Sequence, residues 1–171
     1  FTVVDDDERK IAAWNSNLLP FFEPGMQELL DDVRATGNIA FTSDFDGAVR
    51  GAELVLVSVS TPIKESGVGA GYAPDLQYWE KVARRIARVA GGRKIIVERS
   101  TVPVTTAASM AKVFKAVSPH PVVVLSNPEF AREGNAITDQ LSPDRVMIGG
   151  PKTPEGEAAA AILKDDDGNW G

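Results

Sequence analysis

The chain has 171 residues, a formal net charge of −6, no cysteine and one histidine. These residues therefore hold no disulfide, no cysteine-ligated metal and no thiolate nucleophile, and we expect no metal site. The acidic balance argues against nucleic acid or an anionic membrane as a partner. No run approaches the about 20 apolar residues of a membrane span, and the N-terminus has no signal-peptide pattern, so we expect a cytoplasmic protein.

Short β-branched runs alternate with stretches of helical spacing, and this alternation predicts an α/β fold. The strong runs are continuously apolar, which is typical of parallel strands covered on both faces. We expect strands at residues 2–4, 54–59, 94–97 and 122–125, with weaker candidates at 39–41 and 146–148. Apolar stripes predict helices near residues 26–33, 76–90 and 107–117, and a last helix beginning at Thr153-Pro154-Glu155.

Asp5 ends the first predicted strand. An acid at the end of the second strand of a dinucleotide-binding unit binds the ribose hydroxyls and repels a 2′-phosphate. The run from Asp5 to Glu8 is equally an acidic turn that opens a helix, and both interpretations stay open. The glycine-rich phosphate loop of such a unit lies about 20 residues before the acid, outside this sequence. Gly67–Gly71 does not replace it, because Tyr72 stands where the third glycine is required.

Two predicted strands end in small hydroxyl residues before a proline, at Ser60-Thr61-Pro62 and at Ser100–Pro103. Ligands of open α/β sheets bind outside the carboxyl ends of the strands, so these positions suit a cofactor or substrate. The alternative is that they cap the following helices. After a third strand, Glu129 and Glu133 lie four residues apart, where one acid could act as a general base or both could be solvated loop acids.

Together these segments resemble the UDP-glucose 6-dehydrogenase family, in particular the amino-terminal NAD-binding domain of its eukaryotic-type members. The resemblance covers residues 1 to about 160. It rests on ordered motifs at Thr2–Asp5, Ile11–Ser16, Leu19-Pro20, Phe22–Gly25, Val59–Pro62, Ser100–Val104, Leu125–Phe130, Glu133-Gly134, Ala136-Ile137, Pro143–Val146, Ile148–Gly150 and Thr153–Gly156.

The resemblance implies a Rossmann-like, doubly wound, mostly parallel sheet that is incomplete, because its first strand and its glycine-rich phosphate loop are absent from this sequence. We expect residues 1–160 to form a partial NAD-binding domain and residues 161–171 to form a divergent tail. In the strand order 3-2-1-4, the missing strand would lie between the strand ending at Asp5 and the strand at 54–59. Another chain supplies that strand, the sheet closes the gap, or the sequence is partial.

By resemblance, NAD is the cofactor. Asp5 matches the acid that binds the adenosine ribose, and Lys10 stands where the family has an arginine beside the adenosine. The other matching cofactor positions are Val59, Ser60, Thr61, Pro62 and Ile63 in one loop, Ser100, Thr101 and Val102 in a second, and Glu133 near the nicotinamide.

The resemblance also implies the chemistry. Glu129 corresponds to the catalytic glutamate, and Thr101 to a threonine that holds a water beside it. Residues matching the sugar-nucleotide site are Glu129, Phe130, Ala131, Arg132 and Glu133, where Ala131-Arg132 departs from the usual small or apolar pair. The family reaction converts UDP-glucose, two NAD and water into UDP-glucuronate and two NADH through a cysteine thioester, whose hydrolysis Glu129 could serve as acid or base.

Because the chain has no cysteine, we expect a fragment of such a dehydrogenase that is inactive alone. One alternative is a non-catalytic structural or binding subunit of a larger assembly. Another is a dehydrogenase of a different nucleotide sugar. Full-length members of the family are expected to form homo-oligomers through regions outside this chain.

Overall fold

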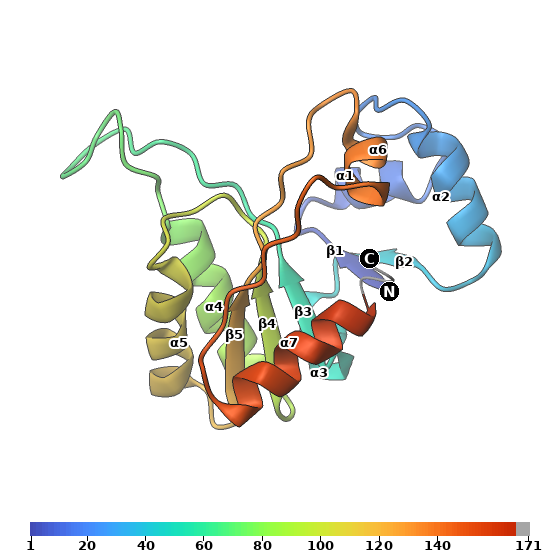
Figure 1. The fold of residues 1–171 in the computed structure, drawn as a ribbon. Helices are drawn as coiled ribbons and strands as arrows, with labels where there is room; N and C mark the ends of the chain where they lie inside the picture. The colour runs from blue at the N-terminus through green and yellow to red at the C-terminus, as the bar shows by residue number, and fades with distance from the viewer. Residues whose placement is uncertain (167–171) are drawn as a thin grey trace. The chain divides into compact units, whose positions relative to one another are not determined.

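The computed structural model describes residues 1–166 and divides into two compact units (Figure 1). Unit 1 comprises Phe1–Ala48 and Phe130–Arg145, and unit 2 comprises Val49–Glu129 and the chain from Val146 onward. The chain therefore leaves unit 2 after Glu129, contributes one segment to unit 1 and returns at Val146. No feature of the sequence predicted this division.

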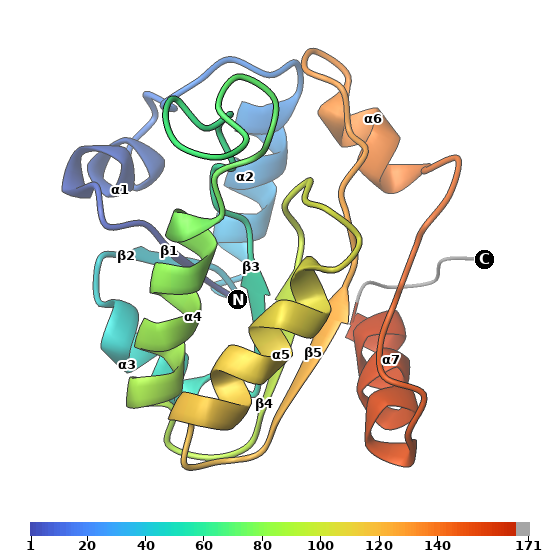
Figure 2. The same ribbon diagram turned by 90° about the vertical axis from the view of Figure 1, so that its left-hand side faces the viewer.

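Unit 2 contains three parallel strands in the order β3-β4-β5, with helices on both faces of the sheet (Figures 1 and 2). Helices α4 and α5 cover one face and α7 covers the other. The strands are β3 (Leu54–Val57), β4 (Lys94–Glu98) and β5 (Val122–Ser126), and the helices are α4 (Gln77–Val89), α5 (Thr106–Val117) and α7 (Pro154–Asp166).

The core of unit 2 is built on β4, the central strand, every residue of which is buried. Alternate residues of a strand point to opposite faces of its sheet. Ile95 and Val97 accordingly pack in one cluster with Leu163 of α7. Glu98 and Ile96 therefore point to the other face, which α4 and α5 cover.

Unit 1 contains the parallel pair β1-β2, in which Val3 is in register with Phe41. Aromatic packing joins Trp14, the last residue of the first helix, to this pair. The Trp14 ring stacks on the Phe41 ring at 5.4 Å and meets the Phe21 ring edge-on at 5.4 Å. The elements are β1 (Thr2–Val4), α1 (Glu8–Trp14), α2 (Met26–Ala35), β2 (Ala40–Thr42) and α6 (Ala136–Leu141), while α3 (Phe45–Gly51) crosses the boundary between the units.

The α/β class and the parallel strands are confirmed. Each taken by itself, the two-stranded sheet β1-β2 and the three-stranded sheet β3-β4-β5 match the 3-2 and 4-5-6 portions of the Rossmann order. Each sheet forms within one unit, so the three alternatives for the missing strand stay predictions.

Most predicted elements are present, with ends that shift by one or two residues. The strand predicted at 146–148 is wrong. Only one isolated bridge forms nearby, between Ser126 and Gly149, and the carbonyl oxygen of Met147 instead accepts a hydrogen bond from Asn127 Nδ2 at 2.9 Å. The Asn127 side chain thus binds the Met147 backbone where a neighbouring strand would otherwise do so.

The C-terminal helix α7 continues through residue 160 to Asp166. The boundary at residue 160 stays a prediction, and residues 167–171 of the expected tail lie outside the described part of the chain. None of the described helices is both long enough and apolar enough to cross a lipid bilayer.

Candidate functional site

The first feature of unit 2 is the contact between the loops that follow β3 and β4. Ser100 is buried, and its Oγ donates to the carbonyl oxygen of Val59 at 2.9 Å and accepts from the Val59 N–H at 3.0 Å. One hydroxyl thus satisfies both backbone groups of Val59, as a paired strand residue would. Ser100 therefore positions the loop at residues 59–63, in addition to its predicted place at the cofactor.

A second contact joins the same loops. Thr61 Oγ1 donates to the carbonyl oxygen of Thr101 at 3.2 Å. The two hydroxyl-proline motifs, 41 residues apart at Val59 and Ser100, are thereby held together within unit 2. Ser60, Pro62 and Ile63 remain exposed beside them, where a bound molecule could reach them.

The loop after β5 is tied to the loop after β4. Asn127 is buried; its N–H donates to the Glu98 carbonyl oxygen at 2.9 Å, and its Oδ1 accepts from the Arg99 guanidinium. The N–H of Glu129 donates to the carbonyl oxygen of Arg99 at 3.3 Å. Glu129 is exposed, and the structure holds its backbone next to the loop that carries Thr101.

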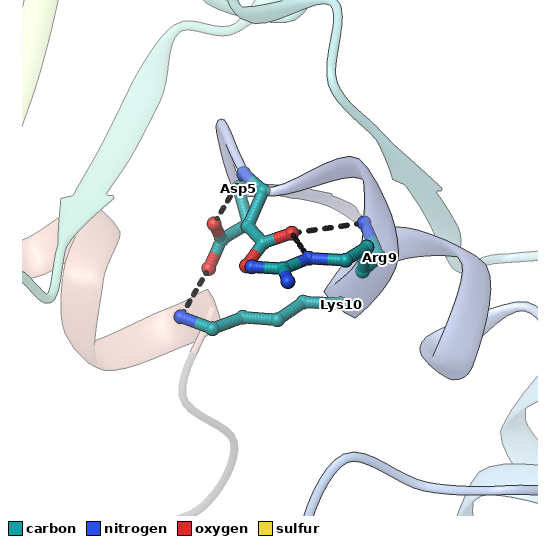
Figure 3. Close-up of polar contacts among 4 residues, drawn as sticks. Asp5, Arg9 and Lys10 are labelled. Atoms are coloured by element: carbon teal, nitrogen blue, oxygen red, sulfur yellow. Dashed lines mark hydrogen bonds and ion pairs between the residues drawn. The ribbon is translucent and has the colours of Figure 1, made fainter.

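In unit 1, Asp5 follows β1 directly. Its Oδ1 accepts from the Asp7 N–H at 2.8 Å, and its Oδ2 lies 3.4 Å from Lys10 Nζ (Figure 3). Asp7, rather than Asp5, caps α1 by accepting from the Arg9 N–H, and hydrogen bonds from Arg9 lower the pKa of the Asp7 carboxyl. The helix-opening role that the sequence left open thus belongs to Asp7, while 37% of the Asp5 side chain stays exposed.

The segment at residues 130–133 also lies in unit 1. Arg132 donates to Asp139 from its backbone N–H at 3.0 Å and from Nη2 at 2.7 Å, and this lowers the pKa of Asp139. Arg132, where the sequence departs from the family pattern, therefore binds another residue of unit 1. The Arg145 guanidinium lies 5.8 Å from the centre of the Phe130 ring, while Ala131 is half-buried and Glu133 is exposed.

Two buried acids were not singled out as site residues by sequence reasoning. Glu23 is only 7% exposed, and its two carboxylate oxygens accept from the N–H groups of Gly134 and Ala136, each at 2.8 Å. Glu98 is 1% exposed at the end of β4. The available signal for Glu23 was a lone acid between Phe22 and a Pro-Gly turn, and for Glu98 an acid at the end of a continuous apolar strand.

Burial raises the pKa of the Glu98 carboxyl above its ordinary value of 4.5. A hydrogen bond from Ser126 lowers the same pKa, but by less. Glu98 Oε1 and Trp79 Nε1 are both buried without a hydrogen-bond partner among residues 1–166. The folded state therefore holds the proton of Glu98 more tightly than the unfolded state does. This contribution to stability is complete below about pH 4.5 and is lost as the pH rises through the folded-state pKa.

We expect the substitution Glu98→Gln to stabilise the protein increasingly, relative to the wild type, as the pH rises from 5 to 8. An amide cannot ionise and therefore avoids placing a buried charge at the end of β4. Urea unfolding of both proteins at several pH values measures the difference. Glu53→Gln, at an exposed position of the same unit, is the matched control and should show no such trend; a pH-independent difference for Glu98→Gln would contradict the assignment.

The predicted site residues thus fall into two groups. Within unit 2 the structure brings together the loops that carry residues 59–63, 100–102 and 129. Unit 1 holds Asp5, Lys10 and the segment 130–133. Each group presents exposed polar side chains at the carboxyl ends of parallel strands or in the segment that follows Glu129.

Comparison with known proteins identifies the family. The family model described as the UDP-glucose/GDP-mannose dehydrogenase family, NAD binding domain, matches residues 1–165. The chain belongs to this family. NAD is the cofactor of the matched domain, and the residues present fit it, because an exposed carboxylate at the end of β1 is a suitable acceptor for the hydroxyls of a ribose.

Similar proteins agree with this assignment. The chain is 48% identical over 169 residues to UDP-glucose 6-dehydrogenase 4 of Arabidopsis thaliana, which covers 98% of the chain and 35% of that protein. It is 49% identical over 164 residues to UDP-glucose 6-dehydrogenase of Rattus norvegicus, which covers 95% of the chain and 33% of that protein. The chain thus spans about a third of the length of the curated relatives it matches.

Solved structures support the fold. A UDP-glucose dehydrogenase from Pyrobaculum islandicum superposes with a TM-score of 0.85 at 30% identity, covering 96% of this chain and 37% of that one. A GDP-mannose dehydrogenase from Pseudomonas aeruginosa superposes with a TM-score of 0.84 at 31% identity, with the same two coverages. The Rossmann-like assignment made from the sequence is confirmed.

Proposed function

We propose that this chain supplies the NAD-side and part of the sugar-nucleotide side of an NAD-dependent UDP-glucose 6-dehydrogenase. The observation that carries the proposal is the assembly, within unit 2, of the loops bearing Thr61, Thr101 and Glu129 by direct hydrogen bonds. The relatives named UDP-glucose 6-dehydrogenase, at 48% and 49% identity, support the choice of substrate.

Each residue has a distinct task in this proposal. Asp5 accepts hydrogen bonds from the adenosine ribose, with Lys10 beside it. Glu129 exchanges a proton with the water that hydrolyses a thioester, and Thr101 holds that water. NAD, when bound, accepts the hydrides. The thiolate that forms the thioester comes from outside these 171 residues, which hold no cysteine, so the chain alone should give no NADH from UDP-glucose.

A chimera tests the proposal directly. Residues 1–165, the range of the family model, would replace the matching third of the Rattus norvegicus UDP-glucose 6-dehydrogenase, which supplies the rest of the enzyme. We expect the chimera to produce two NADH for each UDP-glucose oxidised. Absorbance of NADH measures the rate, and thermal stabilisation by NAD checks that the chimera is folded. A folded chimera that binds NAD and oxidises no UDP-glucose would refute the proposal.

The variant Asp5→Ala in the same chimera ties the activity to this chain. Loss of a hydrogen bond to a charged group corresponds to about a tenfold change, so we expect the KM for NAD to rise by about that factor and the discrimination against NADP to relax. An unchanged KM for NAD would show that Asp5 does not contact the cofactor.

GDP-mannose is the second candidate substrate, because the GDP-mannose dehydrogenase structure superposes almost as closely as the UDP-glucose dehydrogenase structure. Offering each nucleotide sugar to the native protein that carries this chain separates the two.

We also propose that a strand from outside these residues pairs with β1 and β3, which the separate two-stranded and three-stranded sheets support. Homo-oligomerisation through other regions and a cytoplasmic location belong to the same proposal, and a non-catalytic subunit remains its rival.

A further inference from the structure

The two oxygens of Glu23 connect parts of unit 1 that are more than 110 residues apart in the sequence. One oxygen accepts from the Gly134 N–H and the other from the Ala136 N–H, both at 2.8 Å. We call this pair of contacts the Glu23 clasp. Because Glu23 is only 7% exposed, water does not substitute readily for either contact.

The clasp ends at the turn residue Gly134 and at Ala136, the first residue of α6 (Ala136–Leu141). The first N–H groups of a helix have no partner within the helix, and Ala136 supplies one of them. Asn135, at the cap position, makes no side-chain cap bond and instead donates from Nδ2 to Asp139 at 2.7 Å. The Glu23 carboxylate, from a distant segment, therefore accepts a hydrogen bond at the N-terminus of α6, where the Asn135 side chain makes none.

A second contact joins the same two segments. Gly25 has φ +77°, a conformation that favours glycine, and begins α2. A Cβ placed on Gly25 would lie 3.5 Å from Ile137 Cδ1, so the Ile137 side chain covers this turn. Polar contacts from Glu23 and apolar packing at Gly25 therefore hold the start of α6 from adjacent positions.

The clasp acts directly on the end of the segment at residues 130–134, and residues 130–133 are those predicted to contact the sugar nucleotide and NAD. The side chains of Arg132 and Asn135 bind Asp139, and the Asn135 N–H donates to the Arg132 carbonyl oxygen at 3.0 Å, all within residues 130–145. Asp139 thus shapes the segment, whereas Glu23 attaches it to the rest of unit 1. We propose that Glu23 is a positioning residue, whose carboxylate fixes residues 130–134 in the conformation that presents Phe130–Glu133 to the sugar nucleotide.

This inference rests on the proposed function for its kinetic consequence, but the clasp itself is tested on the chain alone. Glutamine has a single acceptor oxygen, so Glu23→Gln leaves either Gly134 or Ala136 without a partner. We expect hydrogen exchange of at least one of these two amides to accelerate about tenfold or more, with unchanged exchange in α4. Glu28→Gln, an exposed acid on α2, is the matched control and should leave both amides as in the wild type. Unchanged exchange in Glu23→Gln would overturn the clasp.

The kinetic test uses the chimera. We expect Glu23→Gln to raise the KM for UDP-glucose about tenfold while kcat changes much less, and Glu23→Asp, which keeps the charge, to recover part of the loss. A fall in kcat alone, with unchanged KM and a reduced fraction of folded protein, would assign Glu23 a structural role only and overturn positioning. If the unsubstituted chimera forms no NADH, the proposed function fails, and the exchange rates still decide whether the clasp exists.

Discussion

Replacing Glu129 by glutamine in the chimera is expected to lower its steady-state rate about a hundredfold or more, the usual contribution of a general acid or base. The amide keeps the size of the side chain but cannot exchange a proton with the hydrolytic water. If Glu129 acts in thioester hydrolysis, both hydride transfers precede the blocked step. We therefore expect a rapid burst of NADH in proportion to the enzyme sites, followed by a slow phase, in stopped-flow absorbance.

The geometry around Glu129 makes this outcome specific. Its backbone N–H donates to the carbonyl oxygen of Arg99, and glutamine at this position keeps that hydrogen bond. Glu53→Gln, an exposed acid of the same unit, is the control and should retain both phases. A variant of Glu129 that loses the burst as well as the slow phase would place its role in an earlier step, and a variant with the wild-type rate would remove it from the mechanism.

The fold was predictable where local pattern decides it. The run Lys94–Val97 reads as a strand covered on both faces, and β4 is the fully buried centre of its sheet. Helix α6 was not predictable in this way, because it has only six residues and its first N–H groups depend on Glu23, more than 110 residues earlier. The run at 146–148 has the composition of a strand, yet Asn127 pairs with Met147 through a side chain. Polar contacts between residues far apart in the sequence determine the structure of both segments, and the local pattern of residue types does not indicate such contacts.

Residue types and motifs in the sequence indicated candidate site residues, but they did not indicate which contacts those residues make. The hydroxyl-proline motifs indicated two loops that the structure holds together, and Ser100 directs its hydroxyl to Val59 and so builds the loop. Asp5 was predicted with two open roles, and the structure gives the capping role to Asp7. Glu23 carried only the weak signal of an acid beside a turn, since its burial arises from a segment that the sequence places far away.

The largest effect on stability is expected at Trp79, which is fully buried on α4. Removing its ring leaves a cavity, and a substitution of this kind costs about 3–5 kcal/mol in free energy of unfolding. Because a domain has about 5–15 kcal/mol in total, Trp79→Ala should unfold a large share of the chain at moderate temperature. Urea unfolding followed by far-ultraviolet circular dichroism measures this loss, and hydrogen exchange in β4 shows that unit 2 is the part affected.

Two further variants separate packing from polarity at this position. Tyr78 is the neighbouring aromatic residue on α4 and is 55% exposed, so Tyr78→Ala should change stability by no more than about 0.5 kcal/mol. Trp79→Phe keeps a packed ring and removes an indole N–H that has no hydrogen-bond partner among residues 1–166, so it should cost clearly less than Trp79→Ala. An equal loss for Phe and Ala would show that the N–H carries the energy. A double-mutant cycle with Glu98→Gln would then measure its coupling to the Glu98 carboxyl, whose Oε1 is also buried without a hydrogen-bond partner among residues 1–166.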